Sequence, residues 1–197
     1  MDRAAMAEGF GMILHVFCEL LLFAACLWAA LGSLRRRQGW AVPGFALFGL
    51  AALLGALEYA GLDALAPLHQ QASDIAGRLG LLLIALGGVG GWGLNLAVAG
   101  LCTVMSLLPD GPSLAVNLLA LLAIVRRGRS RRWPLALAGA VLFAAAGLLV
   151  GTRGEWSGVA RVDIFHLVLA LAVWCWGRAE LGSRGQDWRE AGVSRGH

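Results

Sequence analysis

Long apolar runs separated by short polar clusters dominate the chain. A membrane-spanning helix needs about 20 apolar residues, whereas a barrel strand alternates apolar and polar positions over about 10 residues. The runs show no such alternation, so the pattern predicts membrane-spanning α-helices. They cover residues 10–32, 40–60, 75–108, 113–125, 133–151 and 162–178.

The third run, residues 75–108, is too long for one helix and short for two. Its middle, GGVGGWG at 87–93, contains five glycines in seven residues, which favours a tight turn over a helix interior. Arginine clusters at 33–39 and 126–132 both lie in the cytoplasm only if the chain between them crosses the bilayer an even number of times. Splitting the run gives seven spans. Six spans are the alternative, with the glycines forming a small-residue packing face.

The predicted fold class is all-α, a polytopic transmembrane helix bundle with its N-terminus outside and its C-terminus cytoplasmic. The proposed outer loops, GLDALAPLHQQASD and PDGP, contain no arginine, which agrees with that orientation. We expect one transmembrane domain over residues 1–180 and a disordered polar tail over 181–197. The first apolar run is expected to be a retained helix of a multi-pass protein in a bacterial inner membrane.

Composition agrees with the membrane prediction, since 59% of the 197 residues are hydrophobic and 14% are charged. The basic residues are all arginines and gather in loops, so they indicate topology rather than nucleic-acid binding. Membrane lipids are the expected partners, together with a helix–helix oligomer or a membrane complex. The four cysteines fall inside apolar runs and are expected to behave as small hydrophobic residues.

A few ionisable residues interrupt the apolar runs. Charged groups cost about 2.5 to 3.5 kcal/mol at the centre of a spanning helix, so each one requires a reason. With the predicted topology they all fall in the outer half of the bilayer, although they come from four helices. These residues are His15 and Glu19, Glu58, Asp74 and Arg78, and Asp163 and His166.

Several of these residues also have an ordinary structural interpretation. Asp163 suits the first turn of the last helix, where the helix dipole favours an acid. Asp74 suits the start of the third helix, with Arg78 one turn later as its ion-pair partner. His69 lies in a predicted outer loop and is expected to be solvated.

Taken together, the histidines and carboxylates favour a metal site. Imidazole and carboxylate are the ligands of catalytic zinc, which keeps three protein ligands and one position for water. We predict His15, Asp163 and His166 as zinc ligands. Glu19 or Glu58 would then act as a general base or orient a ligand.

The seven spans and the polar start of the last helix resemble the heptahelical hydrolase superfamily that includes alkaline ceramidases and progestin/adipoQ-type receptors. Small bacterial membrane proteins of related architecture are similar at GALEYAG (55–61) and at VDIFHLVLALAVWCWGRA. The resemblance implies a zinc ion bound by histidines and cleavage of lipid amide bonds. The chain departs from the superfamily at Ala170, where a second histidine is typical, and in lacking serine in 40–60.

Three functions follow as alternatives. The first is a metal-dependent hydrolase of a lipid amide or ester at the outer leaflet. The second is a non-enzymatic small transporter, channel subunit or complex partner, in which Glu19, Glu58 and Asp74 bind a proton, cation or substrate. The third is a b-type haem held by His15 and His166.

Overall fold

The computed structural model describes residues 3–107, 111–127, 132–179 and 181, and most of them are helical. The continuous helices are α1 (Arg3–Arg35), α2 (Ala41–Tyr59), α5 (Trp92–Leu107), α6 (Gly111–Arg127) and α8 (Arg161–Ala179). Two further helices contain a π-helical segment. One joins α3 (Ala66–Ile75), π-helical η2 (Ala76–Gly80) and α4 (Leu81–Ala85), and the other joins α7 (Trp133–Ala145) and π-helical η3 (Ala146–Val150).

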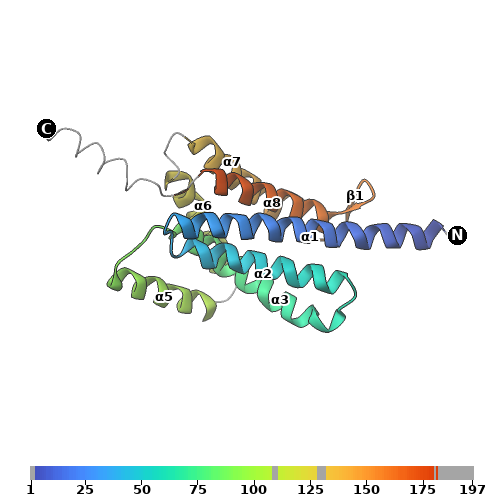
Figure 1. Ribbon diagram of the computed structural model, residues 1–197, viewed down its shortest axis with the longest axis horizontal. Coiled ribbons are helices and arrows are strands. Elements are labelled where there is room, and N and C mark those ends of the chain that lie inside the picture. The colour runs from blue at the N-terminus through green and yellow to red at the C-terminus, as the bar shows by residue number, and fades with distance from the viewer. Residues whose placement is uncertain (1–2, 108–110, 128–131, 180, 182–197) are drawn as a thin grey trace.

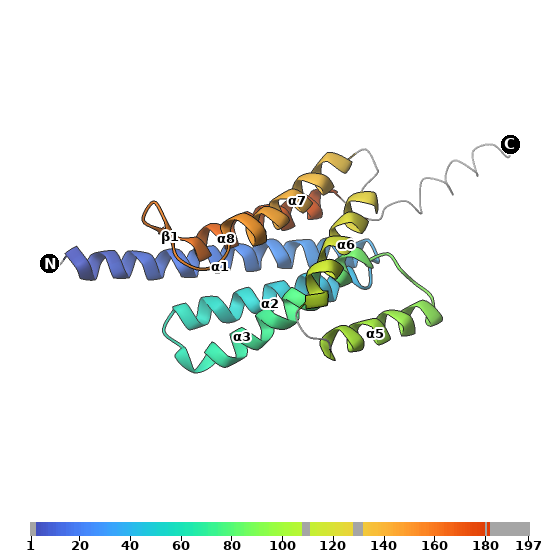
Figure 2. The ribbon, with the colours of Figure 1, turned by 180° about the vertical axis from the view of Figure 1, so that it is seen from behind.

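The described part of the chain thus holds seven helices, which confirms the all-α class. Two short elements complete it: a 3₁₀ turn, η1 (Asp63–Leu65), and an antiparallel hairpin of β1 (Glu155–Trp156) and β2 (Val159–Ala160). The hairpin projects beside the N-terminal half of α1, whereas α5 stands at the opposite side of the bundle (Figures 1 and 2).

Four stretches are long and apolar enough to cross a membrane: Gly9–Arg35, Ala41–Tyr59, Trp133–Val150 and Arg161–Ala179. Two apolar helices are shorter, Trp92–Leu107 and Leu114–Arg126. Many large apolar side chains on the bundle face outward, as expected of a surface that lies in lipid. These features support a membrane protein, while seven crossings and the orientation stay predictions.

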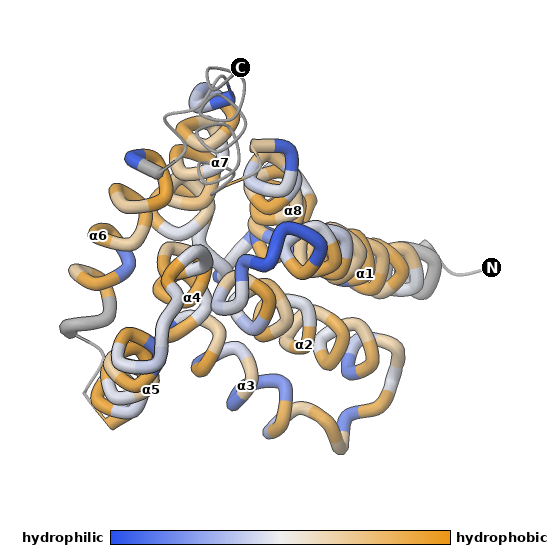
Figure 3. Tube along the Cα trace, turned by 60° about the vertical axis from the view of Figure 1, so that its left-hand side comes forward, coloured by the Kyte–Doolittle hydropathy of each residue, from blue (hydrophilic) through white to orange (hydrophobic). Residues whose placement is uncertain are grey.

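The direction of the helices follows from their contacts. Helix α1 runs parallel to α8, because His15 meets Asp163 near the start of α8 and Trp28 meets Gly177 near its end. Helix α2 runs antiparallel to α1, because Gly49 lies beside Cys26 and Gly55 beside Glu19. The hydrophilic connection between α1 and α2 stands out among mainly hydrophobic helices (Figure 3). We call this end of the bundle the arginine end, defined by Arg35, Arg36, Arg37, Arg132 and Arg178.

Tryptophans packed on glycines close the bundle near the arginine end. A Cβ atom at Gly177 would overlap the Trp28 ring, and one at Gly139 would lie 2.6 Å from Nε1 of Trp176. The Trp176 indole N–H donates to the carbonyl of Ala136 over 3.3 Å. These contacts join α1, α8 and α7 at distances that larger residues would forbid.

Two expectations about the middle of the chain have opposite outcomes. The glycine turn is confirmed, since α4 ends at Ala85 and α5 begins at Trp92, with Gly91 at a φ of +100°. The loop predicted over 61–74 is wrong, because most of it forms η1 and α3. Apolar residues at 65, 68, 72 and 75 give this segment one apolar face, and Pro67 suits the first turn of a helix.

Three other expectations fall wholly or partly outside the described residues. They are the first half of the PDGP turn, the centre of the second arginine cluster and the polar tail after 181. The hairpin at 155–160 was not expected from the sequence. Its turn uses positive φ at Ser157 and Gly158.

Candidate functional site

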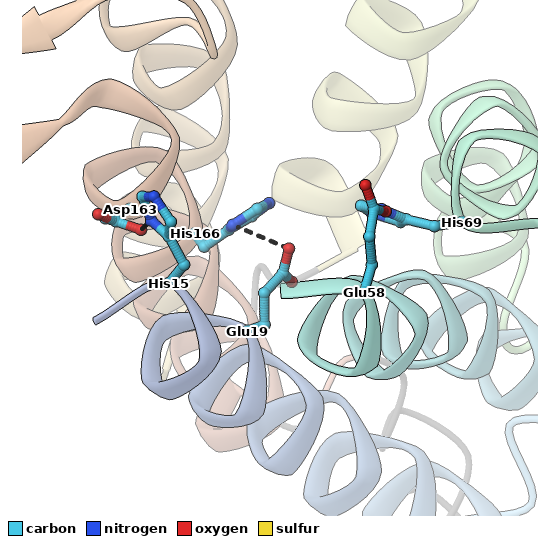
Figure 4. A network of polar contacts seen from close by, with 6 residues as sticks. All are labelled: His15, Glu19, Glu58, His69, Asp163 and His166. Atoms are coloured by element: carbon cyan, nitrogen blue, oxygen red, sulfur yellow. Dashed lines mark hydrogen bonds and ion pairs between the residues drawn. The ribbon is translucent and has the colours of Figure 1, made fainter. Parts of the chain in front are cut away.

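Three histidines and three carboxylates meet at the end of the bundle opposite the arginine end (Figure 4). Nδ1 of His15 lies 2.5 Å from Asp163, and Nδ1 of His69 lies 2.6 Å from Glu58. Nδ1 of His166 lies 3.3 Å from Oε1 of Glu19. We call these six residues the acid–histidine cluster.

Helix geometry explains two of the three pairs. His15 and Glu19 are four residues apart and therefore one turn apart on α1, while Asp163 and His166 are one turn apart on α8. Because α1 and α8 run parallel, His15 meets Asp163, and one turn further along both helices Glu19 meets His166. The third pair joins the end of α2 to α3, which the short η1 connection brings back alongside it.

A cavity of about 550 Å³ lies beside the cluster, inside the bundle. Its polar lining includes Glu19, Tyr59, His69, Asn117 and His166, and much of the remaining surface is apolar or aromatic. His15, Asp163 and Glu58 are not among its lining residues. Glu19, His69 and His166 are therefore the cluster members that a ligand in the cavity would meet.

Glu19 occupies the central position of the cluster. Figure 4 shows it between the His15–Asp163 pair and the His69–Glu58 pair, with its carboxylate directed at His166. Its side chain is 1% exposed, yet neither oxygen accepts a hydrogen bond from the described residues. Most buried carboxylates accept at least one hydrogen bond, and Glu19 is an exception among the described residues.

Gly55 makes room for this arrangement. A Cβ atom at position 55 would lie 2.5 Å from Oε1 of Glu19 and 3.0 Å from Cε1 of His69. The two side chains therefore share the space above one glycine of α2. A side chain at this position would require the Glu19 carboxylate to shift, and the His69 ring to give by a few tenths of an ångström.

Tyr59 joins two of the pairs and was not predicted to belong to the site. Its ring centroid lies 5.0 Å from that of His15 and 6.4 Å from that of His69. A signal was present, because Tyr59 is the single tyrosine of the sequence and directly follows Glu58. His69 was likewise expected in solvent, and its place on α3 was hidden by the wrong loop assignment.

Asp74 and Arg78 lie apart from the cluster. They line a separate hollow of the surface together with Gln71 and Ser106. On α3 and η2 the cavity-lining positions are His69, Ser73, Ala76 and Gly77, whereas Asp74 is exposed. The predicted convergence thus holds for five of the seven sequence-predicted residues and does not extend to these two.

The predicted zinc ligands do not form a common donor set. His15 and Asp163 contact each other, whereas His166 contacts Glu19. Over the described ranges, no group of three or more histidine, cysteine, aspartate or glutamate residues is arranged to hold a metal ion. The donor types suit zinc, but they are divided between separate pairs, so zinc binding stays a prediction.

Comparisons with known proteins add no relative. No protein-family model matches the chain, and no curated protein or solved structure is significantly similar to it. The resemblance to heptahelical hydrolases therefore stays a prediction.

Proposed function

We propose that the chain binds an organic cation inside the membrane, as a small transporter does, and that Glu19 receives the positive charge. The observation that carries the proposal is the Glu19 carboxylate, which is buried, lines the cavity and accepts no hydrogen bond from any described residue. Burying an ion costs several kcal/mol unless a partner compensates. A protonated amine would supply both a charge and N–H donors.

The cavity has the electrostatic character that such a ligand requires. Asp163 and Glu58 add two carboxylates on either side of Glu19, and no arginine stands among the described residues that line the cavity. The rings of Tyr59 and Phe165 also belong to the lining, and aromatic faces attract ammonium groups by about 0.5 to 2 kcal/mol. The volume lies within the range of about 300 to 1,000 Å³ that is typical of small-molecule sites.

We place this site in the outer half of a bacterial inner membrane, with seven crossings, the N-terminus outside and the C-terminus inside. The positive-inside rule supports the orientation, because more of the described arginines lie at the arginine end than at the end of the acid–histidine cluster, where Arg153 and Arg161 lie. A cation would then reach Glu19 from the outer side. The membrane potential, negative inside, would favour its binding there.

The test is binding of butylamine, a primary amine that is protonated at neutral pH, to protein in lipid nanodiscs. We expect butylamine to bind and butanol, its neutral counterpart, not to bind. Glu19→Gln should weaken amine binding at least about tenfold, since a hydrogen bond to a charged group contributes about 1.5 to 3 kcal/mol. Asp74→Asn is the control, because it removes an exposed carboxylate outside the cavity, and it should bind like the parent. Equal binding to Glu19→Gln would overturn the proposal.

A second candidate is the metal-dependent hydrolase of a lipid amide or ester. It is favoured by one observation, the carboxylates at Nδ1 of His15 and His69, because proteins orient metal-binding histidines in this way. Elemental analysis of the purified protein beside His15→Ala and His166→Ala decides between the two candidates. Near one zinc per chain, lost in both variants, together with cleavage of a lipid amide, would replace the cation-binding proposal.

A further inference from the structure

The cavity is elongated along α2. Phe48, Ala51, Ala52 and Tyr59 line it, and Gly55 stands between them on the same helical face. Since an α-helix rises 1.5 Å per residue, the lined face extends about 16 Å from Tyr59 to Phe48. Glu19 lies opposite Gly55, so about 10 Å of cavity remains beyond it toward the arginine end.

That inner part of the cavity is apolar. Its lining includes Leu22, Phe48, Phe143 and Leu169, and the Phe48 and Phe143 rings meet edge to face at 5.8 Å. Phe143 in turn stacks on the buried ring of Trp176 at 5.6 Å, and the lining does not extend to Trp176. A small hydrophilic cation at Glu19 would leave this apolar volume unused.

The cavity also reaches the side of the bundle between the two π-helical segments. Gly77 of η2 and Gly147 of η3 both line it and both are exposed, and a Cβ atom on either would meet no neighbouring atom of the described residues within 4 Å. Within the described residues, η2 has its main contacts outside its own helix with α2 and α5, and η3 has its main contacts with α7 and α8. The side chain of Asn117 bridges part of the gap by donating to the carbonyl of Gly77 over 2.9 Å.

The surroundings of this opening are those of a lipid-facing surface. Ile75, which directly precedes η2, is 46% exposed, and Leu148 and Leu149, which belong to η3, are 66% and 76% exposed. η3 belongs to a stretch that is long and apolar enough to span a membrane. A molecule dissolved in the bilayer could therefore pass from lipid into the cavity without crossing water.

From the apolar inner part and the side opening we infer that the ligand is a single-chain amphiphilic amine taken up from the membrane. Its ammonium group binds Glu19, and its tail lies along the Gly55–Phe48 face of α2. The opening between η2 and η3 admits it from the bilayer. This inference rests on the proposed binding of a cation at Glu19 and specifies the class of ligand.

The first test is a chain-length series of butylamine, hexylamine, octylamine and dodecylamine, measured in nanodiscs with protein-free nanodiscs as the partition blank. When the affinity is referred to the free amine in water, which the protein-free blank defines, each methylene buried in the cavity should raise the Glu19-dependent affinity about threefold to fourfold. The rise should stop when the tail exceeds about 10 Å, where Phe48 and Phe143 close the cavity. Octanol should not show Glu19-dependent binding at any concentration.

The second test narrows the opening with Gly77→Leu and Gly147→Leu, each of which places a side chain in open space. Stopped-flow tryptophan fluorescence can follow octylamine, since Trp176 stacks on a ring that lines the cavity. We expect octylamine association to slow severalfold in either variant. Gly100→Leu on α5 is the matched control, because its Cβ also meets open space but it does not line the cavity. Thermal unfolding checks that each variant is folded. If only one of the two leucine variants folds, that variant is sufficient to test entry through the opening.

The outcomes separate the two proposals. If butylamine and octylamine bind Glu19 with equal affinity, cation binding stands and the amphiphilic ligand is wrong. If neither amine binds in a Glu19-dependent way, both proposals fail. Unchanged association rates in both leucine variants would overturn entry through the side opening.

Discussion

Helices α1 and α8 contact each other in two different ways along their length. Near the arginine end, the Trp28 ring occupies the space that Gly177 leaves free, so the contact depends on shape. Near the acid–histidine cluster, the same helices meet through His15 with Asp163 and Glu19 with His166. One helix pair thus combines an apolar contact with a polar one.

The two ends differ in whether buried polar atoms lack hydrogen-bond partners. The ring-on-glycine contact needs nothing further, since apolar groups pack without directional partners. At the polar end, both oxygens of Glu19 and Oδ2 of Asp163 are buried without a hydrogen-bond partner in the described structure. Natural proteins accept such a deficit at functional sites and compensate for it elsewhere. We therefore assign stability to the apolar end and ligand binding to the polar end.

The largest change in the free energy of unfolding is expected for a substitution at the apolar end. Gly177→Leu would force the Trp28 ring away from α8 and should lower the free energy of unfolding by about 3 kcal/mol, as expected for overpacking. Thermal unfolding in detergent, followed by circular dichroism, measures the loss. Gly100→Leu should leave the unfolding temperature near that of the parent. A stable Gly177→Leu variant would show that shape does not hold this end together.

A smaller loss is expected where a polar pair is broken. Asp163→Asn keeps the size of the side chain but removes the charge that faces His15, which should cost about 1 to 3 kcal/mol. The same thermal unfolding experiment detects it, with Glu155→Gln on the exposed hairpin as the matched control. An unfolding temperature equal to that of the parent would mean that this pair contributes only to the site.

The smallest change in the free energy of unfolding, and the most informative one, is expected for a substitution of Glu19. Because Glu19 carries a buried carboxylate without a hydrogen-bond donor, Glu19→Gln should leave the ligand-free protein unchanged or stabilise it by up to about 1 kcal/mol. The comparison of unfolding temperatures with and without butylamine then separates the two roles of this residue. Destabilisation as large as that of Asp163→Asn would make Glu19 a structural partner of His166 and remove the contrast between the ends.

Most of the helices could be predicted from the sequence, because apolar runs of about 20 residues leave few alternatives. The observed bounds of α2, α7 with η3, and α8 lie within one residue of the predicted runs at each end. The segment 61–74 failed for a physical reason. Its apolar positions are separated in the sequence by polar residues, among them Gln70, Gln71, Ser73 and Asp74, so average hydropathy indicated a loop while the periodicity indicated a helix.

The sequence was sufficient to predict that polar residues from several helices lie close together, but not which acid pairs with which histidine. Alternating helix directions bring the ends of helices together, which sufficed for His15, Glu19, Glu58, Asp163 and His166. Pairing depends on the rotation of each helix, and one residue changes the direction of a side chain by about 100°. Asp74 follows the cavity-lining Ser73 by one residue and therefore points elsewhere.

Gly55 has a consequence for recognising this site in other chains. Because Glu19 and His69 share the space above it, an alanine at the equivalent position is incompatible with both side chains as they lie here. The glycine and the acid come from different helices and are 36 positions apart in the sequence, so a short motif search would not connect them. A glutamate near the middle of the first helix, paired with a glycine three residues before Glu-Tyr at the end of the second, is the signature that distant relatives should retain together or lose together.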